Sequence, residues 1–331
     1  MSFFAILFAL LIEQVRPLAR HNPVHAALRR WVRWSIRNCD AGKPQHGWIA
    51  WGLAAVVPAL VAMAIHWALL LWVGWPAAVV WSVMVLYATL GFRQFSHHFT
   101  AIRDALDAGD EDRARELLAE WQQVDAAMLP RREIVRHVIE YSVLAAHRHV
   151  FGVLAWFSVL AAFGFGPAGA VLYRMGEFVT RYWRYRGQTQ PVSEAAQSVA
   201  TRAWAVIDWL PARITALSFA IVGSFEEAID CWRHHAQRFP NDNDGVILAA
   251  TSGAVNVRLG GEALRSSAFS PNGSQTFSAA SVGPTTEVDT ESTPGRDAEP
   301  AHLRSIVGLV WRTVVLWMVL LALLTLARLL G

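Results

Sequence analysis

The chain has a single lysine, Lys43, and only two cysteines among 331 residues. Because Cys39 and Cys231 lie far apart and lack metal-ligand spacing, the sequence predicts neither a disulfide framework nor a zinc site. Charged residues make up 17% of the chain, and 29 basic side chains nearly balance 26 acidic ones. A nucleic-acid-binding protein needs a concentrated basic face, so no nucleic-acid partner is predicted.

Hydrophobic residues are abundant instead. They account for 54% of the chain, with sixteen tryptophans and sixteen phenylalanines, and the mean hydropathy is +0.30. A helix needs about 20 apolar residues to cross the hydrocarbon core of a bilayer. Such runs occupy residues 47–73, 76–92, 150–172 and 305–331, and the opening 1–12 forms a shorter one without a signal-peptide pattern. The sequence therefore predicts an all-α, polytopic membrane helical bundle.

The distribution of arginine predicts the orientation of the chain. Residues 16–43 are rich in arginine, which places this loop in the cytoplasm. The hairpin of residues 47–92 returns the chain to the same side, so the following segment is expected to be cytoplasmic too. There Ala114, Leu117, Leu118 and Trp121 have the spacing of an amphipathic helix with Asp110 as its N-cap. Whether 150–172 is re-entrant or is followed by a re-crossing at 204–223 stays open.

Composition divides the chain into six segments. Residues 252–304 are rich in serine, glycine, threonine and proline, which is typical of a flexible linker. The expected segments are an N-terminal membrane part at 1–92, cytoplasmic amphipathic helices at 93–142, membrane and interfacial helices at 143–232, a connecting segment at 233–251, the linker at 252–304 and a C-terminal membrane helix at 305–331.

Two motif-like patterns have a plain structural interpretation. Residues 164–169 match the glycine pattern of dinucleotide-binding folds, but they lie inside an apolar run, so we interpret them as a glycine and proline break in a membrane helix. The histidine pairs lack a glutamate or cysteine residue that completes a ligand set at i+3 or i+4, so no metal site is predicted. These pairs are His97 with His98, His147 with His149, and His234 with His235.

The strongest local signal is an acid and an arginine in an apolar segment, Asp208 and Arg213, on either side of Pro211. Burying ionisable groups in such a setting costs free energy unless they pair or face a polar cavity, so a functional role is one hypothesis. Anchoring of an interfacial helix is the other. Tyr173 with Arg174, just after the glycine-rich break, and Glu140 are further candidates for binding a ligand.

The order of elements and these motifs resemble a membrane-protein superfamily that joins CobD/CbiB, the cobalamin-biosynthesis synthase, with AmpE, which is linked to β-lactamase induction. The likeness is carried by the amphipathic helices of residues 105–129, the turn at 166–174 and the motif at 210–213. For the synthase branch it implies ATP-dependent amide formation between adenosylcobyric acid and an aminopropanol phosphate or similar amino alcohol, at a magnesium-nucleotide site.

The acidic motifs of that branch are largely replaced in this sequence. Asp125 is the acid retained from the Arg-Asp-Thr motif, and Asp208 stands where the family shows an asparagine. Magnesium prefers carboxylate oxygens, so few ligands for it remain. Other family positions with acid or asparagine side chains are occupied here by His147, Arg148, Phe151, Glu177, Thr180, Trp204 and Ala205.

The resemblance therefore favours a multi-pass protein of the bacterial inner membrane, a non-catalytic signalling or accessory member closer to AmpE, with no cofactor. A divergent adenosylcobinamide-phosphate synthase, using ATP and magnesium, is the alternative, and a transporter-like bundle with Asp208 and Arg213 on a substrate path is a third. The expected partners are the lipid bilayer and an unidentified small molecule or membrane protein. Asp208, Arg213, Tyr173, Arg174, Asp125 and Glu140 are the candidate ligand-binding residues.

Overall fold

The computed structural model describes residues 2–15, 23–122, 126, 129–186, 192–261 and 292–330. These residues form helices joined by short turns, with two isolated β-bridges and no strand among them. The all-α prediction is confirmed. Asp125 and residues 262–291 of the expected linker lie outside the described residues.

Helices long and apolar enough to cross a membrane also confirm the membrane class. They span Pro44–Trp72, Arg131–Ala162, Glu194–Val222 and Pro300–Ala327, and two shorter apolar helices cover Phe3–Val15 and Trp75–Thr89. Large apolar side chains on these helices are exposed, including Leu71, Trp72 and Leu324, as expected for contact with acyl chains. The second of these helices begins at Arg131, so it takes in part of the segment expected to be a cytoplasmic insertion at 93–142.

The chain forms two compact units. Unit 1 comprises Met1–Arg93, Arg148–Pro211 and Met318–Gly331, and unit 2 comprises Gln94–His147 and Ala212–Trp317. The long helices α11 (Glu194–Val222) and α15 (Pro300–Leu330) each contribute to both units.

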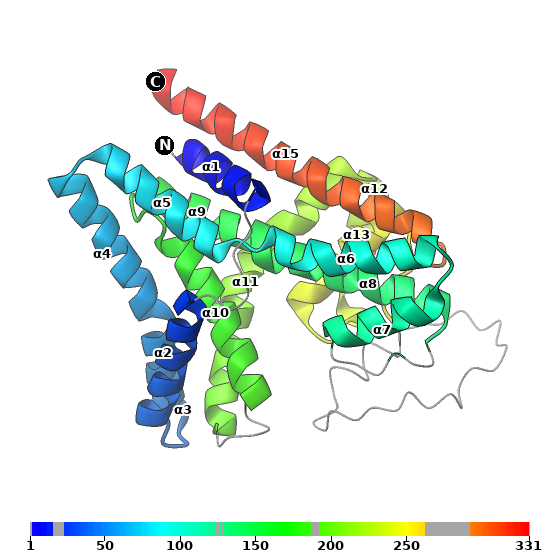
Figure 1. Ribbon diagram of the computed structural model, residues 1–331, viewed down its shortest axis with the longest axis horizontal. Coiled ribbons are helices and arrows are strands. Elements are labelled where there is room, and N and C mark those ends of the chain that lie inside the picture. Colours follow the sequence, from blue (N-terminus) through cyan, green and yellow to red (C-terminus); the bar gives the residue numbers. More distant parts are fainter. Residues whose placement is uncertain are drawn as a thin grey trace. The chain divides into compact units, whose positions relative to one another are not determined.

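Unit 1 contains an apolar hairpin. Helix α4 (Val57–Trp72) turns at Gly74, whose φ of 106° suits glycine, into α5 (Trp75–Thr89), as Figure 1 shows. Before the hairpin come α1 (Ser2–Val15), α2 (Pro23–Cys39), α3 (Pro44–Trp51) and the π-helical turn η1 (Gly52–Val56). Helix α1 packs against α5. The predicted helical hairpin is present.

The predicted glycine break separates α9 (Gly152–Ala162) from α10 (Ala168–Arg186). Gly164 and Gly166 adopt φ values of 81° and 56°, which are accessible to glycine, and the Trp67 indole donates to the Gly164 carbonyl oxygen at 2.8 Å. Because no strand precedes these glycines in the described chain, they do not form a dinucleotide-binding turn. The apolar run 150–172 is divided between α9 and the first turns of α10.

Unit 2 contains the amphipathic helices. Helix α6 (Phe92–Asp107) is followed by α7 (Glu111–Gln122), where the Asp110 carboxylate accepts the Arg113 N–H at 3.0 Å and caps the helix as predicted. Ala114 and Leu118 are buried on the predicted apolar face. The unit also contains α8 (Arg131–Ala146), α12 (Phe225–His235), η3 (Ala236–Arg238) and α13 (Asp242–Val255). The turn η2 (His147–Phe151) follows α8, and its residues after His147 belong to unit 1.

Both ends of the expected linker 252–304 are ordered, which corrects the prediction there. Helix α13 continues to Val255, and the Ser252 hydroxyl donates to the Thr293 hydroxyl at 2.7 Å. Thr293 in turn exchanges hydrogen bonds with the backbone of Leu259, and both of these residues are buried. Composition is misleading here because small hydroxyl side chains satisfy buried backbone groups as readily as they face water.

Candidate functional site

Tyr173 and Asp208 meet inside unit 1. The Tyr173 hydroxyl on α10 donates to Asp208 Oδ1 on α11 at 2.7 Å, and both residues are fully buried. Burial, with the adjacent Asp208 charge, raises the pKa of Tyr173 well above its ordinary value. The phenol therefore stays protonated and donates a charge-assisted hydrogen bond to the carboxylate.

Gly152, the first residue of α9, makes room for this pair. A Cβ at this position would lie 2.1 Å from the Tyr173 hydroxyl oxygen. On another side the indole of Trp204 lies against the phenol ring, with ring centroids 5.0 Å apart. Helices α9, α10 and α11 thus together fix the position of the Tyr173 side chain.

Arginines surround a buried glutamate one turn further along α10. Glu177 accepts from Arg174 at 2.9 Å and lies 3.5 Å from the Arg181 Nε. Burial raises the pKa of Glu177, but the charges of Arg174, Arg181 and Arg148 outweigh it and hold that pKa below its ordinary value. We call these four residues the arginine–glutamate cluster. It carries more positive than negative charge and suits an anionic group.

The arginine–glutamate cluster makes stability sensitive to acid. Because the pKa of Glu177 is lower in the folded protein than its ordinary value of 4.5, its stabilisation is fully present above that pH and is lost as the pH falls through the folded pKa. We expect the unfolding temperature in detergent to drop below about pH 4, with a smaller drop for Glu177→Gln. An identical acid profile in the variant and the parent would contradict this role, and Glu116→Gln, at an exposed ion pair, is the control.

The candidate Glu140 lies in unit 2, on α8. Its side chain is 3% exposed and its Oε1 accepts the Gly260 N–H at 2.7 Å. Arg136, one turn earlier, forms an ion pair with Glu133 and lies 3.9 Å from Glu140 Oε1. These contacts hold the backbone after α13, so Glu140 has a structural role in the described chain.

The two ionisable candidates of α11 have different hydrogen-bond partners. Asp208 accepts from Tyr173, whereas Arg213 in unit 2 donates to the Asn243 side chain on α13 at 3.0 Å. Arg174 contacts Glu177, which the sequence analysis did not select as a candidate. The i, i+3 and i+4 spacing of Arg174, Glu177 and Arg181 was the available signal.

The donors for a metal ion are few in the part of the chain that the structure describes. No group of three histidine, cysteine, aspartate or glutamate side chains there is placed to hold an ion. Glu177 and Asp208, the acids near the Tyr–Arg turn, already bind arginine and tyrosine. These residues do not fit a resident magnesium ion.

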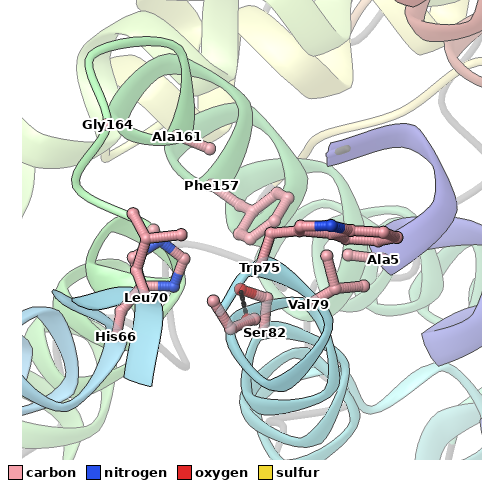
Figure 2. Close-up of a pocket in the computed structure, with 11 residues that line it drawn as sticks. Ala5, His66, Leu70, Trp75, Val79, Ser82, Phe157, Ala161 and Gly164 are labelled. Carbon is pink, nitrogen blue, oxygen red and sulfur yellow. Dashed lines mark hydrogen bonds between the residues drawn. The ribbon is translucent and has the colours of Figure 1, made fainter. Parts of the chain in front are cut away.

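Unit 1 also contains a mostly apolar cavity of about 170 Å³. Figure 2 shows His66 and Leu70 of α4 facing Trp75, Val79 and Phe157 across it. Ser82 uses its hydroxyl to donate to the Ala78 carbonyl at 2.9 Å. No charged carboxylate or guanidinium lines the cavity, so it offers apolar contact to a small group.

Comparison with known proteins shows which family the chain belongs to. The family model described as CobD/CbiB protein matches residues 3–283. The chain belongs to this family. It is 29% identical over 282 residues to the cobalamin biosynthesis protein CobD of Stutzerimonas stutzeri. The aligned region covers 85% of this chain and 82% of that protein. No solved structure matches it.

Other CobD/CbiB relatives match over a shorter part. The cobalamin biosynthesis protein CobD of Chromobacterium violaceum is 33% identical over 185 residues, 56% of this chain and 57% of that protein. The CobD protein of Mycobacterium tuberculosis strain H37Rv is 30% identical over 190 residues, 56% and 58% of the two chains. The matches support the family resemblance, whereas the closer relation to AmpE stays a prediction.

Proposed function

We propose that the protein takes part in cobalamin biosynthesis as a divergent adenosylcobinamide-phosphate synthase, the alternative of the sequence analysis. The observation that carries the proposal is the family match over residues 3–283, with relatives named as cobalamin biosynthesis proteins over most of the chain. The bacterial inner membrane is the proposed location, since the four long apolar helices suit a multi-pass protein.

The arginine–glutamate cluster supports this proposal by its charge. Amide formation joins a carboxyl group to an amine, and the amino alcohol phosphate brings a dianion that must be held during the reaction. Arg181 is 58% exposed, so its guanidinium is accessible to such a phosphate. Arg174 forms an ion pair with Glu177 on the same helix. The described residues do not fit a magnesium ion, so we assign them no metal-dependent step.

A second candidate is an accessory member without amide-forming activity. The observation that favours it is that residues at the family's acidic positions have structural contacts here. His147 Nδ1 lies 2.9 Å from the Thr215 hydroxyl, and the Thr180 hydroxyl contacts the carbonyls of Gly176 and Ala200. Phe151 is fully buried. A signalling role linked to AmpE has no support beyond the resemblance.

Complementation decides between the two candidates. We expect the gene to restore cobalamin-dependent growth to a bacterial host that lacks the synthase, and the purified protein to form adenosylcobinamide phosphate. Arg181→Gln should lower the rate about tenfold or more, because an arginine–phosphate contact contributes about 1.5–3 kcal/mol. Arg202→Gln, at an exposed position of α11, is the matched control.

The opposite result also has a clear interpretation. A protein that is abundant in the membrane but neither restores growth nor forms the product contradicts the synthase proposal and favours the accessory candidate. Equal loss of activity in Arg181→Gln and Arg202→Gln would contradict the role given to the arginine–glutamate cluster.

A further inference from the structure

We propose that helix α2 binds the headgroups of anionic phospholipids through an arginine stripe, which we define as Arg30, Arg33, Trp34 and Arg37. These residues have i, i+3, i+4 and i+7 spacing, so they share one face, and all four are exposed. The other face is buried in unit 1 through Val32, Ser35 and Ile36. The helix therefore packs by one side and presents cationic side chains on the other.

The charge of the stripe is not neutralised within the described chain. Asp40 is the acidic residue between positions 23 and 51. Both of its oxygens are engaged, because Ser193 donates its N–H to Oδ2 at 2.9 Å and its hydroxyl to Oδ1 at 2.7 Å. Among the residues that the structure describes, no ion pair involves an arginine of the stripe. Arg33 donates its Nε–H to the Arg29 carbonyl oxygen at 3.4 Å within the helix, and the terminal N–H groups of the three guanidiniums are available to an anion from outside.

The position of the stripe favours a lipid as that anion. Helix α2 ends at Cys39, and the long apolar helix Pro44–Trp72 begins five residues later, with α3 packed beside α2 (Figure 1). The stripe is therefore close in sequence to the first turn of a helix that is long and apolar enough to cross a membrane. Basic segments next to membrane helices are attracted to the anionic surface of the cytoplasmic leaflet.

Tryptophans next to the stripe support the same assignment. Trp34 is 49% exposed and stacks on Trp31 with ring centroids 5.2 Å apart. The Trp31 indole donates to the Leu53 carbonyl at 3.2 Å, which ties α2 to the third turn of the apolar helix Pro44–Trp72. Trp48 on α3 is exposed to the same extent. Tryptophan is enriched where a membrane meets water, so these rings are suited to the headgroup layer.

The proposed ligand is a phospholipid with net negative charge, such as phosphatidylglycerol. Zwitterionic phosphatidylcholine carries the same phosphate but a compensating ammonium, so the arginines gain less from it. Arg33 and Arg37 lie one turn apart, a spacing that lets two guanidinium groups approach one phosphate or two adjacent headgroups.

The test uses the full chain purified in a neutral detergent. Phosphatidylglycerol or phosphatidylcholine is titrated in, and bound lipid is counted by native mass spectrometry. We expect the parent to retain phosphatidylglycerol in preference to phosphatidylcholine. The triple variant Arg30→Gln, Arg33→Gln and Arg37→Gln should bind phosphatidylglycerol about a hundredfold more weakly, at about fivefold for each arginine near an anionic surface.

A control variant with the same net charge distinguishes the effect of the stripe from the effect of overall charge. Arg113→Gln, Arg132→Gln and Arg233→Gln remove three exposed arginines of unit 2 and should keep the preference for phosphatidylglycerol. The unfolding temperature of each variant without added lipid verifies its fold. Equal retention of the two lipids by the parent, or an equal loss in both triple variants, would overturn the proposal. The first of these results would instead favour an acidic protein as the binding partner of the stripe.

Discussion

Replacing Gly169 by alanine is expected to lower the free energy of unfolding by about 3 kcal/mol or more, because the new methyl group has no space. Gly169 lies in the first turn of α10, and a Cβ there would be 2.0 Å from the carbonyl oxygen of Trp156 and 2.5 Å from its carbonyl carbon. These are backbone atoms of α9, so a change of rotamer cannot relieve the contact. The two helices would have to move apart.

The helix propensity of alanine does not offset this cost. Alanine is favoured over glycine within a helix by about 1 kcal/mol, which is smaller than the overpacking penalty. Thermal unfolding in detergent, followed by circular dichroism, measures the loss. Gly52→Ala is the matched control, because Gly52 has helical φ and ψ of −58° and −45° and a Cβ there would meet nothing within 4 Å.

The control is expected to be neutral or stabilising by about 0.5–1 kcal/mol. If Gly169→Ala unfolds at the same temperature as the parent, the close packing of α9 on α10 is wrong. Separation of these helices would also disturb Tyr173, one turn after Gly169, so a loss of function should accompany the loss of stability.

Hydrophobicity and turn residues predicted much of the fold. The apolar runs, the break at Gly164 and the capped helix after Asp110 are all readable from local sequence, because each depends on neighbours within a few residues. The start of the long helix at Arg131 was missed, since Arg136 and Glu140 make its first turns look polar. In the structure these charged side chains contact one another.

The contacts at the candidate site could not be predicted in the same way. Asp208 and Tyr173 were each selected, but they are 35 positions apart, and their contact depends on how α10 and α11 pack. Glu140 meets Gly260 across 120 positions, in a segment whose composition is typical of a linker. Local patterns indicate which residues are costly to bury, whereas tertiary packing decides which partner compensates each of them.

The Tyr173–Asp208 contact is expected to show strong coupling in a double-mutant cycle. Tyr173→Phe removes the donor and leaves a buried carboxylate with one hydrogen bond fewer, and Asp208→Asn removes the charge that the phenol stabilises. Each change should lower the free energy of unfolding by about 2 kcal/mol, the range for hydrogen bonds to charged groups. The double variant should lose less than the sum, because either single change already breaks the same contact.

The cycle has an internal reference in Tyr141, which is 38% exposed on α8 and has its ring against Trp121. Tyr141→Phe should change stability by less than about 0.5 kcal/mol, and its combination with Asp208→Asn should be additive. Additivity for Tyr173→Phe with Asp208→Asn would show that the hydroxyl and the carboxylate do not depend on each other. Other contacts would then compensate the burial of Asp208 in the apolar segment. The Tyr173–Asp208 hydrogen bond would not stabilise the packing of α10 against α11.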